Sequence, residues 1–465
     1  MNISRALRLV DWPETPHVIS FVGAGGKSSA LFQLAQELAT LKMRVVCATT
    51  TRLAASQIGQ SPAALHIKGD SLPLAEIARL LDEHGQCLLL GQPHAPRGQV
   101  DKLAGVMPQA IDHLVDHASD LNIAAVLIEA DGSRMLPVKA PADHEPVLPQ
   151  RTTILVPVLG LDALGAPLAS DRVHRPERIR RILSLPETAT TARLTPELAA
   201  RLLVDRQGGA KGRPAQAQFI PLLNKADTAS RLAGGRLMAR WLNRRGCPAL
   251  ISTLHSPTLG PVRERWAPIT IIILAAGGST RMGQAKQLMA LDGESMLQRS
   301  VTVALDSDAD QVLVVTGAYH AEVEEALRSL AADHGPRLAW THNQAWQSGQ
   351  ASSVRVGISR LENNVDAAIL MPVDQPLLPA TLLRRLVQRW QQGAEIVAPR
   401  VDGEIRGAPA LFDRAYWPEL SKLNGDVGGR TLLRRYASRV ACVDVSPTTV
   451  RDVDTPGDLE GLFGA

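Results

Sequence analysis

Aromatic side chains are scarce in this sequence, at 3% of residues, with only 3 Tyr and 5 Phe. This scarcity argues against the aromatic platforms on which single-stranded nucleic acids stack. The 4 cysteines lie far apart, so their spacing suggests neither a zinc knuckle nor a disulfide framework. Long apolar runs and a basic-then-apolar start are also missing, so we expect no membrane span and no export signal. These absences predict a protein of the reducing cytoplasm that binds neither nucleic acid nor membrane.

Neither sign of charge dominates, because 50 Lys and Arg stand against 46 Asp and Glu, for a net charge of +4. A sequence pI near 9.0 suits small anionic substrates. With 465 residues and a 45% hydrophobic fraction, the chain is long enough for two or three domains with their own cores. Its apolar periodicity stops at a Pro- and Gly-containing segment that begins near residue 256. We therefore expect one domain at 16–255, a linker at 256–268 and a second domain at 269–465.

The second predicted domain opens with a strand and a Gly-rich turn. Residues 270–274 are a mostly β-branched apolar run, which is typical of a buried strand. The glycines that follow let the backbone approach an anion closely. Arg281 and Lys286 add positive charge, and each charge-assisted contact to a phosphate contributes about 1.5–3 kcal/mol. A turn that merely joins a strand to a helix needs neither cation, so the pattern favours a nucleoside triphosphate loop.

This loop resembles the signature of a known enzyme family. Residues 274–286 read LAAGGSTRMGQAK, which is similar to the molybdopterin nucleotidyltransferases and more closely to molybdenum cofactor cytidylyltransferase. Further motifs of that family recur in the same order. They are NQAWQSG at 343–349 with Ser352 and Ser353 behind it, MPVDQP at 371–376, GAPALF at 407–412, NGDVGGR at 424–430 and DVDTP at 452–456. Ordered motifs across about 268–465 are far more specific than one Gly-rich loop.

The resemblance implies transfer of a nucleoside monophosphate to the terminal phosphate of a pterin, with Mg²⁺ and release of pyrophosphate. Asp374 follows a predicted strand at 367–371, and its place at the carboxyl end of that strand favours a metal ligand. Asp454 would be a second metal ligand, although Asp-Thr-Pro is also an ordinary helix start. The implied catalytic residues are Arg281, Lys286 and Asp374. The implied triphosphate contacts of the loop are Gly277, Gly278, Ser279 and Gly283.

The later motifs imply contacts to the two substrates. Asp426 and Arg430 would position the acceptor, and the alternative is a turn Asp beside a surface Arg. Base or ribose contacts are implied for Asn343, Gly349 and Ser353. The LAAG and PVDQP segments look more like the cytidylyl form than the LAGG and GDMP segments of the guanylyl form. The resemblance therefore favours CTP over GTP.

The first half has a nucleotide signal of its own. An apolar run at 18–22 leads into GAGGKSS at 23–29, after which apolar residues recur at helical spacing. The amides at the helix start and a Lys ammonium would hold phosphates, and a Ser hydroxyl would reach Mg²⁺. The predicted nucleotide-binding residues are Gly23, Gly25, Gly26, Lys27 and Ser28. Phe21 stands where the full pattern has a Gly, so this is a shorter G-x-x-G-K-S form, and a packing turn is the alternative.

Two further features of the first half fit a nucleotide site. A second apolar run at 124–128 ends in Glu129 and Asp131, either of which would hold a metal as at the end of a Walker B strand. Asn-Lys-Ala-Asp at 224–227 resembles the guanine-reading motif of GTPases, with a plain loop as the alternative. His144 and His174 would be surface or capping residues, or else a proton relay or a selenium- or metal-facing contact.

A set of first-half segments resembles the selenium-dependent hydroxylase accessory family over about 16–255. These segments are VGAGGK at 22–27, TTT at 49–51, EADGS at 129–133, APADHEP at 140–146 and VHRPE at 173–177. The setting that this resemblance implies is the maturation of molybdenum hydroxylases. That setting agrees with a cytidylyltransferase on the same chain.

Our interpretation is an α/β fusion of a P-loop-like nucleotide-binding domain with a Rossmann-like nucleotidyltransferase domain. The second domain would transfer CMP from CTP to Mo-molybdopterin with Mg²⁺. The first would bind ATP or GTP as an accessory factor, with a molybdenum hydroxylase apoenzyme as the protein partner. Three alternatives stay open: a nucleotidyltransferase for a sugar or alcohol phosphate, a non-enzymatic carrier of finished cofactor, and a kinase-like first half.

Overall fold

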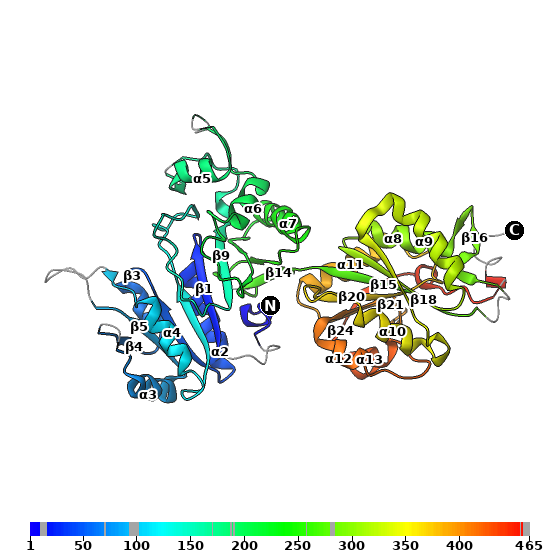
Figure 1. Cartoon of the computed structure of the whole chain (residues 1–465), viewed down its shortest axis with the longest axis horizontal. Coiled ribbons are helices and arrows are strands. Elements are labelled where there is room, and N and C mark those ends of the chain that lie inside the picture. The colour runs from blue at the N-terminus through cyan, green and yellow to red at the C-terminus, as the bar shows by residue number, and fades with distance from the viewer. Residues whose placement is uncertain are drawn as a thin grey trace. The chain divides into compact units, whose positions relative to one another are not determined.

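The computed structural model describes residues 1–9, 16–68, 71–92, 102–169, 171–186, 188, 191–256, 258–279, 284–455 and 457–458. The chain divides into two compact units, Met1–Trp266 and Ala267–Ala465 (Figure 1). Each unit combines helices with a largely parallel sheet, so the predicted α/β class is confirmed. None of the described helices is both long enough and apolar enough to cross a bilayer.

The sheet of the first unit has the strand order β14-β13-β12-β9-β1-β7-β2-β5-β4, with β11 also paired to β9. These strands are β1 (His17–Gly23), β2 (Arg44–Thr49), β4 (Ala64–His66), β5 (Gln86–Leu90), β7 (Ile123–Glu129), β9 (Ile154–Gly160), β11 (Gln218–Phe219), β12 (Leu222–Asn224), β13 (Ala249–Ser252) and β14 (Val262–Trp266). All pairings are parallel except that of β13 with β14. Two short pairs lie outside this sheet, β3 (Leu53–Ala54) with β6 (Lys102–Leu103) and β8 (Val138–Lys139) with β10 (Val173–His174).

Helices cover both faces of this sheet because its strands are apolar on both sides. Ile19 and Phe21 of β1 pack into one core with α2, whereas Val18 and Val22 pack into another core with α3 and α4. A third core holds α5, α6 and α7. The helices are α1 (Ile3–Ala6), α2 (Lys27–Thr40), α3 (Leu74–His84), α4 (Pro108–Asp116), α5 (Pro176–Ile182), α6 (Pro196–Val204) and α7 (Ala229–Asn243).

The boundary between the units differs from the sequence prediction. Residues 256–268 were expected to be a linker, but Val262–Trp266 forms β14, which pairs with β13 of the first unit. Burial alternates along this strand, and Val262, Glu264 and Trp266 are its buried residues. Buried Glu264 is paired with Arg236 and accepts a hydrogen bond from the Trp266 indole at 3.1 Å. Because a charged residue faces inward, this strand does not look apolar in the sequence.

The main sheet of the second unit has the order β19-β18-β15-β20-β23-β21-β22, with β24 paired to β21. Its strands are β15 (Ile269–Ala275), β18 (Gln311–Thr316), β19 (Leu338–His342), β20 (Ala367–Pro372), β21 (Ile396–Val401), β22 (Glu404–Ile405), β23 (Ala410–Asp413) and β24 (Val440–Asp444). Strands β15, β18, β19 and β20 run parallel, and β23 lies antiparallel between β20 and β21. A short hairpin, β16 (Ala290–Leu291) with β17 (Glu294–Ser295), lies apart from the sheet.

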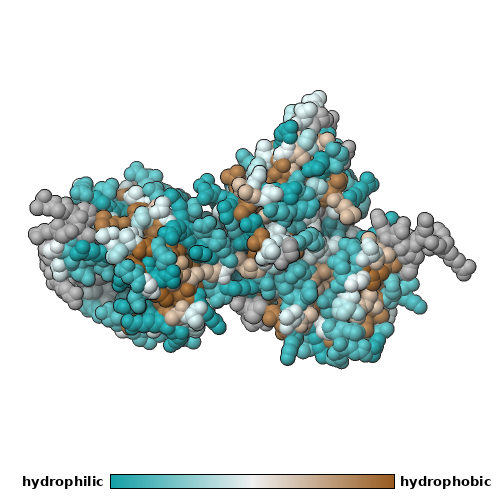
Figure 2. Space-filling model, turned by 180° about the vertical axis from the view of Figure 1, so that it is seen from behind, coloured by the Kyte–Doolittle hydropathy of each residue, from teal (hydrophilic) through white to brown (hydrophobic). Residues whose placement is uncertain are grey.

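Helices also cover both faces of the second sheet. Ile271 and Ile273 of β15 pack with α8, α9 and α11, and Ile272 between them packs on the opposite face with α10, α12 and α13. The helices are α8 (Met296–Leu305), α9 (His320–His334), α10 (Gln350–Ser359), α11 (Ala380–Gln391), α12 (Trp417–Leu420) and α13 (Arg430–Arg435). Figure 2 shows that hydrophilic residues prevail on the visible face of each unit, with smaller hydrophobic areas between them.

Candidate active site

Two strand ends bring the predicted loop and the predicted metal ligand together in the second unit. Parallel strands β15 and β20 pair so that Leu274 lies opposite Pro372. The Gly-rich turn starts just after β15, and Asp374 comes two residues after β20. Because the carboxyl ends of parallel strands share one edge of the sheet, both segments open on the same side.

A large cleft of about 910 Å³ lies at this edge. Its volume is at the upper end of the range for small-molecule sites. We call it the loop cleft, and its lining residues include Gly277, Gly278, Ser279, Lys286, Gln287, Trp346, Gly349, Gln350, Ser353, Asp374, Asp426 and Asp454. The structure thus brings together side chains from most of the predicted motifs.

Lys286 lies between two carboxylates in this cleft. Its ammonium Nζ donates to Asp374 Oδ2 and to Asp454 Oδ1, each at 2.8 Å. Burial lowers the pKa of Lys286, but the charge and hydrogen bond of Asp374, together with those of Asp454, raise it further, so the net shift is upward. Lys286 is therefore a fixed cation that holds both carboxylates toward one point.

The two carboxylates fit a divalent cation. Magnesium ions are commonly held by one or two protein carboxylates together with substrate phosphates. No group of three or more His, Cys, Asp or Glu side chains that could hold a metal occurs in the described part of the chain. A metal at Asp374 and Asp454 would accordingly take its remaining ligands from the triphosphate and from water.

Gln287 is a residue of this site that the sequence analysis missed. Its amide nitrogen donates to the carbonyl oxygens of Ala275 and Gly277, at 3.1 and 3.3 Å, and its Oε1 accepts from the Ser279 hydroxyl at 3.3 Å. The Lys286 amide also donates to Ser279 Oγ at 3.1 Å. These bonds tie the turn to the segment that carries Lys286. The sequence signal for this role is the place of Gln287 directly after the predicted Lys286.

Gly278 and Trp346 explain why the turn needs a glycine. A Cβ atom at Gly278 would lie 2.9 Å from the Trp346 ring.

Arg281 and Gly283, predicted to bind the triphosphate, lie outside the described residues.

Asn343 does not line the cleft, in contrast to its expected contact with base or ribose. It is 1% exposed, and its amide nitrogen donates to the hydroxyls of Ser352 and Ser353, at 2.7 and 3.0 Å. Its Oδ1 accepts from the amide of Ala345 at 3.0 Å. Because all of its polar atoms are engaged behind the cleft wall, Asn343 positions Ser353, which does line the cleft.

Gly349 and Asp426 join two walls of the loop cleft. Gly349 has φ +102°, and a Cβ there would lie 2.4 Å from the carbonyl oxygen of Gly425. The amide of Gln350, the first residue of α10, donates to Asp426 Oδ1 at 3.3 Å. The 424–430 loop is thereby fixed against the start of α10.

A second cleft, of about 620 Å³, adjoins the first and shares Asp374 and Asp454 with it. We call it the arginine cleft, and its polar lining includes Gln350, Gln375, Arg406, Arg430, Arg451 and Asp452. Asp426 and Arg430, predicted to act together, thus line different clefts. Gln375 donates to Asp452 Oδ1 at 3.0 Å. Burial raises the pKa of Asp452, and the nearby charges of Asp374 and Asp454 raise it further.

The first unit places its predicted phosphate loop between β1 and α2. Gly23, Gly25 and Gly26 all have positive φ, and a Cβ at Gly25 would lie 2.3 Å from the Gly160 nitrogen. Lys27 Nζ donates to the Gly23 carbonyl at 2.8 Å. The Ser28 hydroxyl donates to Glu129 Oε2 at 2.6 Å. The predicted strand, turn and helix are therefore present, with Glu129 facing the turn.

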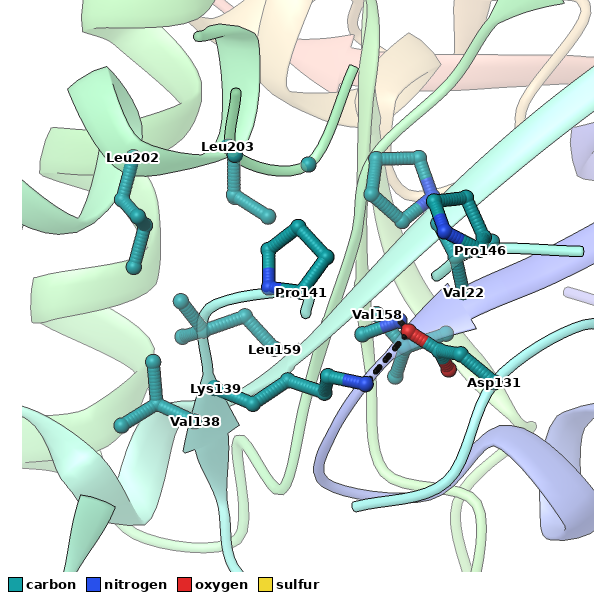
Figure 3. Close-up of a pocket in the computed structure, with 14 residues that line it drawn as sticks. Val22, Asp131, Val138, Lys139, Pro141, Pro146, Val158, Leu159, Leu202 and Leu203 are labelled. Carbon is teal, nitrogen blue, oxygen red and sulfur yellow. Dashed lines mark hydrogen bonds and ion pairs between the residues drawn. The ribbon is translucent and has the colours of Figure 1, made fainter. Parts of the chain in front are cut away.

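Asp131 connects this loop to a buried ionic network. It accepts from the Gly23 amide at 2.9 Å and lies 3.3 Å from Lys27 Nζ. On its other side it pairs with Lys139 at 2.9 Å, and Lys139 pairs with Glu145 at 2.7 Å. Figure 3 shows Asp131 and Lys139 meeting beside a small cavity walled by Pro141, Pro146 and Leu203. That cavity encloses about 20 Å³, which suits a single water molecule and excludes a nucleotide.

Glu145 belongs to the same network, and His174 lies opposite Lys139 in the pairing of β10 with β8. Burial raises the pKa of Glu145, but hydrogen bonds from Arg175 and Lys139 lower it more, to about 2. Burial and the charges of Arg175 and Lys139 lower the pKa of His174 to about 4. His174 is therefore neutral at pH 7. His144, next to Glu145, is exposed, and its role stays a prediction.

Of the Asn-Lys-Ala-Asp segment, Asn224 contacts the predicted phosphate loop. Asn224 is 1% exposed and donates to the Gly25 carbonyl at 2.8 Å, while its Oδ1 accepts from Ser252 at 3.1 Å. Lys225 pairs with Asp162 at 2.8 Å, and Asp227 accepts from the Thr253 hydroxyl at 2.6 Å. All three side chains thus have partners within the unit.

The fold of the second unit and its two joined clefts around a pair of carboxylates define a nucleotidyltransferase domain. Residues 271–440 match the family model described as "MobA-like NTP transferase domain", and residues 19–177 match the model described as "YqeC protein". The chain belongs to the MobA-like NTP transferase family and carries a YqeC domain in its first half.

Individual relatives match one half each. Purine catabolism protein PucB of Bacillus subtilis (strain 168) is 31% identical over 199 residues, which are 41% of this chain and 93% of PucB. The uncharacterized protein YqeC of Escherichia coli (strain K12) is 36% identical over 175 residues, or 38% of this chain. That match spans 64% of the length of YqeC. Among solved structures, Rv0371c from Mycobacterium tuberculosis H37Rv is 29% identical, with a TM-score of 0.37 over 43% of this chain and 99% of Rv0371c.

Proposed function

We propose that the second unit transfers CMP from CTP to Mo-molybdopterin and releases pyrophosphate. The observation that carries this proposal is the pair of clefts that meet at Asp374 and Asp454, because a group transfer needs a donor and an acceptor on either side of one centre. The loop cleft would hold the nucleotide, and the arginine cleft would hold the acceptor. The LAAG and PVDQP motifs favour CTP over GTP as the nucleotide.

The chain's own residues then have separate tasks. Backbone amides of Gly277, Gly278 and Ser279 would bind the triphosphate, and Gln287 keeps that turn in place. Arg281 and Gly283 would complete this contact. Lys286 orients the two carboxylates and would neutralise charge on the phosphates.

Asp374 and Asp454 would hold Mg²⁺, which supplies charge neutralisation for an in-line attack on the α-phosphorus. Ser353 and Gly349 line the loop cleft, and we assign them to the sugar or base end of the nucleotide. Asp426 would position this end of the nucleotide indirectly, because it accepts a hydrogen bond from the Gln350 amide. It would not contact the acceptor. Arg430 would contact the acceptor.

For the first unit we propose binding of ATP or GTP at the turn formed by Gly23, Gly25 and Gly26. Lys27 and Ser28 would contact the phosphates, and Glu129 or Asp131 would hold or orient the metal. We propose that this unit acts as an accessory factor for loading a molybdenum hydroxylase apoenzyme. The supporting observation is that Lys27, Ser28 and Glu129 converge on one turn.

The first test of the second unit is pyrophosphate release by the full chain with Mo-molybdopterin and Mg²⁺, comparing CTP, GTP and ATP. We expect release with CTP alone. Release with a sugar or alcohol phosphate in place of the pterin, and none with the pterin, would instead support a different acceptor. Tight binding of the finished dinucleotide without any turnover would support a carrier.

The first unit is tested by equilibrium binding of ATP and GTP to the full chain. We expect Lys27→Ala to abolish binding of the preferred purine nucleotide. Phosphate transfer from that nucleotide to a second substrate would identify a kinase-like enzyme instead of an accessory factor.

A further inference from the structure

The segment 224–227 of the first unit starts against the predicted phosphate loop. Strands β1 and β12 both run parallel to β9, so the loop after β1 and the segment that begins at the end of β12 lie at the same edge of the sheet. Asn224 Nδ2 donates to the Gly25 carbonyl at 2.8 Å. A Cβ at Gly26 would lie 2.3 Å from the same nitrogen. Asn224 therefore packs directly on the turn that would hold the phosphates.

Two hydroxyls at the end of the neighbouring strand β13 hold both ends of this segment. The Ser252 hydroxyl donates to Asn224 Oδ1 at 3.1 Å, and the Thr253 hydroxyl donates to Asp227 Oδ1 at 2.6 Å. Ser252 and Thr253 are both buried. Because β12 and β13 pair in one sheet, Asn224 and Asp227 are fixed relative to each other.

The residues after Thr253 return to the phosphate loop. A Cβ at Gly26 would lie 3.7 Å from Leu254 Cδ1. His255 Nε2 forms a hydrogen bond with the Ser29 hydroxyl, in the first turn of α2, at 3.0 Å. The segment that holds Asp227 thus runs beside the same turn.

Asp227 is the member of the segment that can still accept hydrogen bonds. Asn224 is 1% exposed, whereas the Asp227 side chain is 49% exposed. An ionised carboxylate has about four acceptor positions. Of the described residues, Thr253 donates to Oδ1 and Arg231 donates to Oδ2, at 3.3 Å, so each oxygen keeps a free lone pair. Asp227 therefore presents two adjacent acceptors to a ligand.

We propose that Asp227 reads the base of the nucleotide held by the first unit, so that this unit selects GTP over ATP. This inference rests on the proposed nucleotide binding at the turn that carries Lys27. Guanine offers two adjacent donors, N1–H and the 2-amino group, which match the two oxygens of a carboxylate. Adenine lacks the 2-amino group and would turn the lone pair of its N1 toward the carboxylate. A site that hydrogen-bonds particular donors rejects a ligand without them.

The test is calorimetric titration of the β,γ-imido analogues of GTP, ATP and xanthosine triphosphate into the full chain. These analogues resist hydrolysis. Mg²⁺ is present, and saturating CTP without an acceptor occupies the second unit. The binding that Lys27→Ala removes is assigned to the first unit. We expect this binding to be tighter for the GTP analogue than for the ATP analogue by about 100-fold or more, the range for two charge-assisted hydrogen bonds.

Asp227→Asn has an outcome that a purely structural role would not produce. The variant amide offers a donor in place of one acceptor, and xanthine carries a carbonyl oxygen where guanine has its 2-amino group. We expect the GTP analogue to bind about 100-fold more weakly and the xanthosine analogue to bind more tightly than to the unchanged protein.

Two further variants complete the series. Thr253→Val keeps the carboxylate but removes the hydroxyl that orients it, and should reduce the preference for the GTP analogue by about 10-fold. The matched control is Asp116→Asn at the end of α4, because Asp116 is 50% exposed and is likewise paired with an arginine, Arg151. The control should keep the full preference.

The outcomes separate base reading from nucleotide binding. Equal affinity for the GTP and ATP analogues, or an unchanged preference in Asp227→Asn, would overturn base reading and leave the nucleotide site standing. A loss of the GTP analogue without a gain of the xanthosine analogue, or an equal loss in Asp116→Asn, would overturn the direct contact with Asp227. Binding of none of the analogues would overturn the proposed function of the first unit together with this inference.

Discussion

Asp374 and Asp454 are carboxylates that line both clefts, and Lys286 binds both of them. The sequence predicted all three as site residues from motif resemblance and from the strand before Asp374. Their convergence on one point needed the structure, because Asp454 lies 168 residues from Lys286 along the chain. Asn343 could not be placed from sequence either, since the direction of its side chain depends on how Ser352 and Ser353 pack.

Asp374→Asn should lower turnover in the CMP transfer assay by about 10²–10³-fold, the scale for removing one preorganised electrostatic group. The amide keeps the shape of the side chain but loses the charge that would hold the metal. Asp333→Asn, on the exposed surface of α9, is the control and should keep turnover within about twofold. Near-normal turnover of Asp374→Asn would remove this carboxylate from the mechanism.

Glu145 makes the stability of the first unit depend on pH. Its pKa is lowered to about 2, from an ordinary value of 4.5, because the hydrogen bonds from Arg175 and Lys139 outweigh the effect of burial. A carboxyl with a depressed pKa stabilises the fold above its ordinary pKa, and that contribution is lost as the pH falls through about 2. We expect Glu145→Gln to destabilise the unit by about 2 kcal/mol at pH 7 and by much less near pH 2.

Urea unfolding of the full chain at a series of pH values measures this difference. Glu83→Gln, which removes an exposed helical ion pair with Arg79, should change the unfolding free energy by less than about 0.5 kcal/mol. A Glu145→Gln deficit that stays constant from pH 7 to pH 2 would contradict the assigned charge.

At the scale of elements, the buried parallel strands were the most predictable part of the fold. β1 and β15 are mostly apolar because helices cover both faces of their sheets, and each strand ends at a Gly-rich turn. β14 escaped prediction because Arg263 and Arg265 alternate with its buried residues and Glu264 faces inward. Whether a charged residue points into a sheet depends on a partner, here Arg236, that the local sequence does not reveal.

The start of α10 offers a test of how loop packing shapes the loop cleft. Gly349→Ala would force a Cβ to within 2.4 Å of the Gly425 carbonyl, so the 424–430 loop has to move. We expect the KM for CTP to rise by about 10- to 100-fold, because small displacements of positioning groups are costly. Gly403→Ala is the matched control, since Gly403 has φ +85° but nothing within 4 Å of the added Cβ.

Steady-state kinetics with varied CTP and a fixed, saturating acceptor distinguish these variants. Both substitutions strain a positive-φ residue, so a rise in KM that is common to the two variants reports backbone strain alone. An equal KM in Gly349→Ala and Gly403→Ala would contradict the role of this contact.

At the scale of the whole molecule, each unit has its own sheet and its own cores, which the sequence predicted from two separate strand-and-turn patterns. A ligand stabilises only the unit that binds it, by about 2.7 kcal/mol when its concentration is 100 times the dissociation constant. In differential scanning calorimetry with Mg²⁺, we therefore expect CTP to raise the midpoint of one transition. ATP or GTP should raise the midpoint of the other.

Variants assign the two transitions. Asp374→Asn should reduce the shift with CTP and leave the shift with the purine nucleotide, and Lys27→Ala should do the reverse. A single transition that responds equally to both kinds of nucleotide would contradict two independent binding units.

The ammonium of Lys286 also acts as a built-in counterion. Two carboxylates that face one point repel each other, and many metal sites depend on their ion to cancel that repulsion. Here the protein supplies the compensating charge itself, at 2.8 Å from each oxygen. Stripping divalent ions with a chelator should therefore abolish the proposed CMP transfer without unfolding the second unit, so that the loss of activity should be reversible.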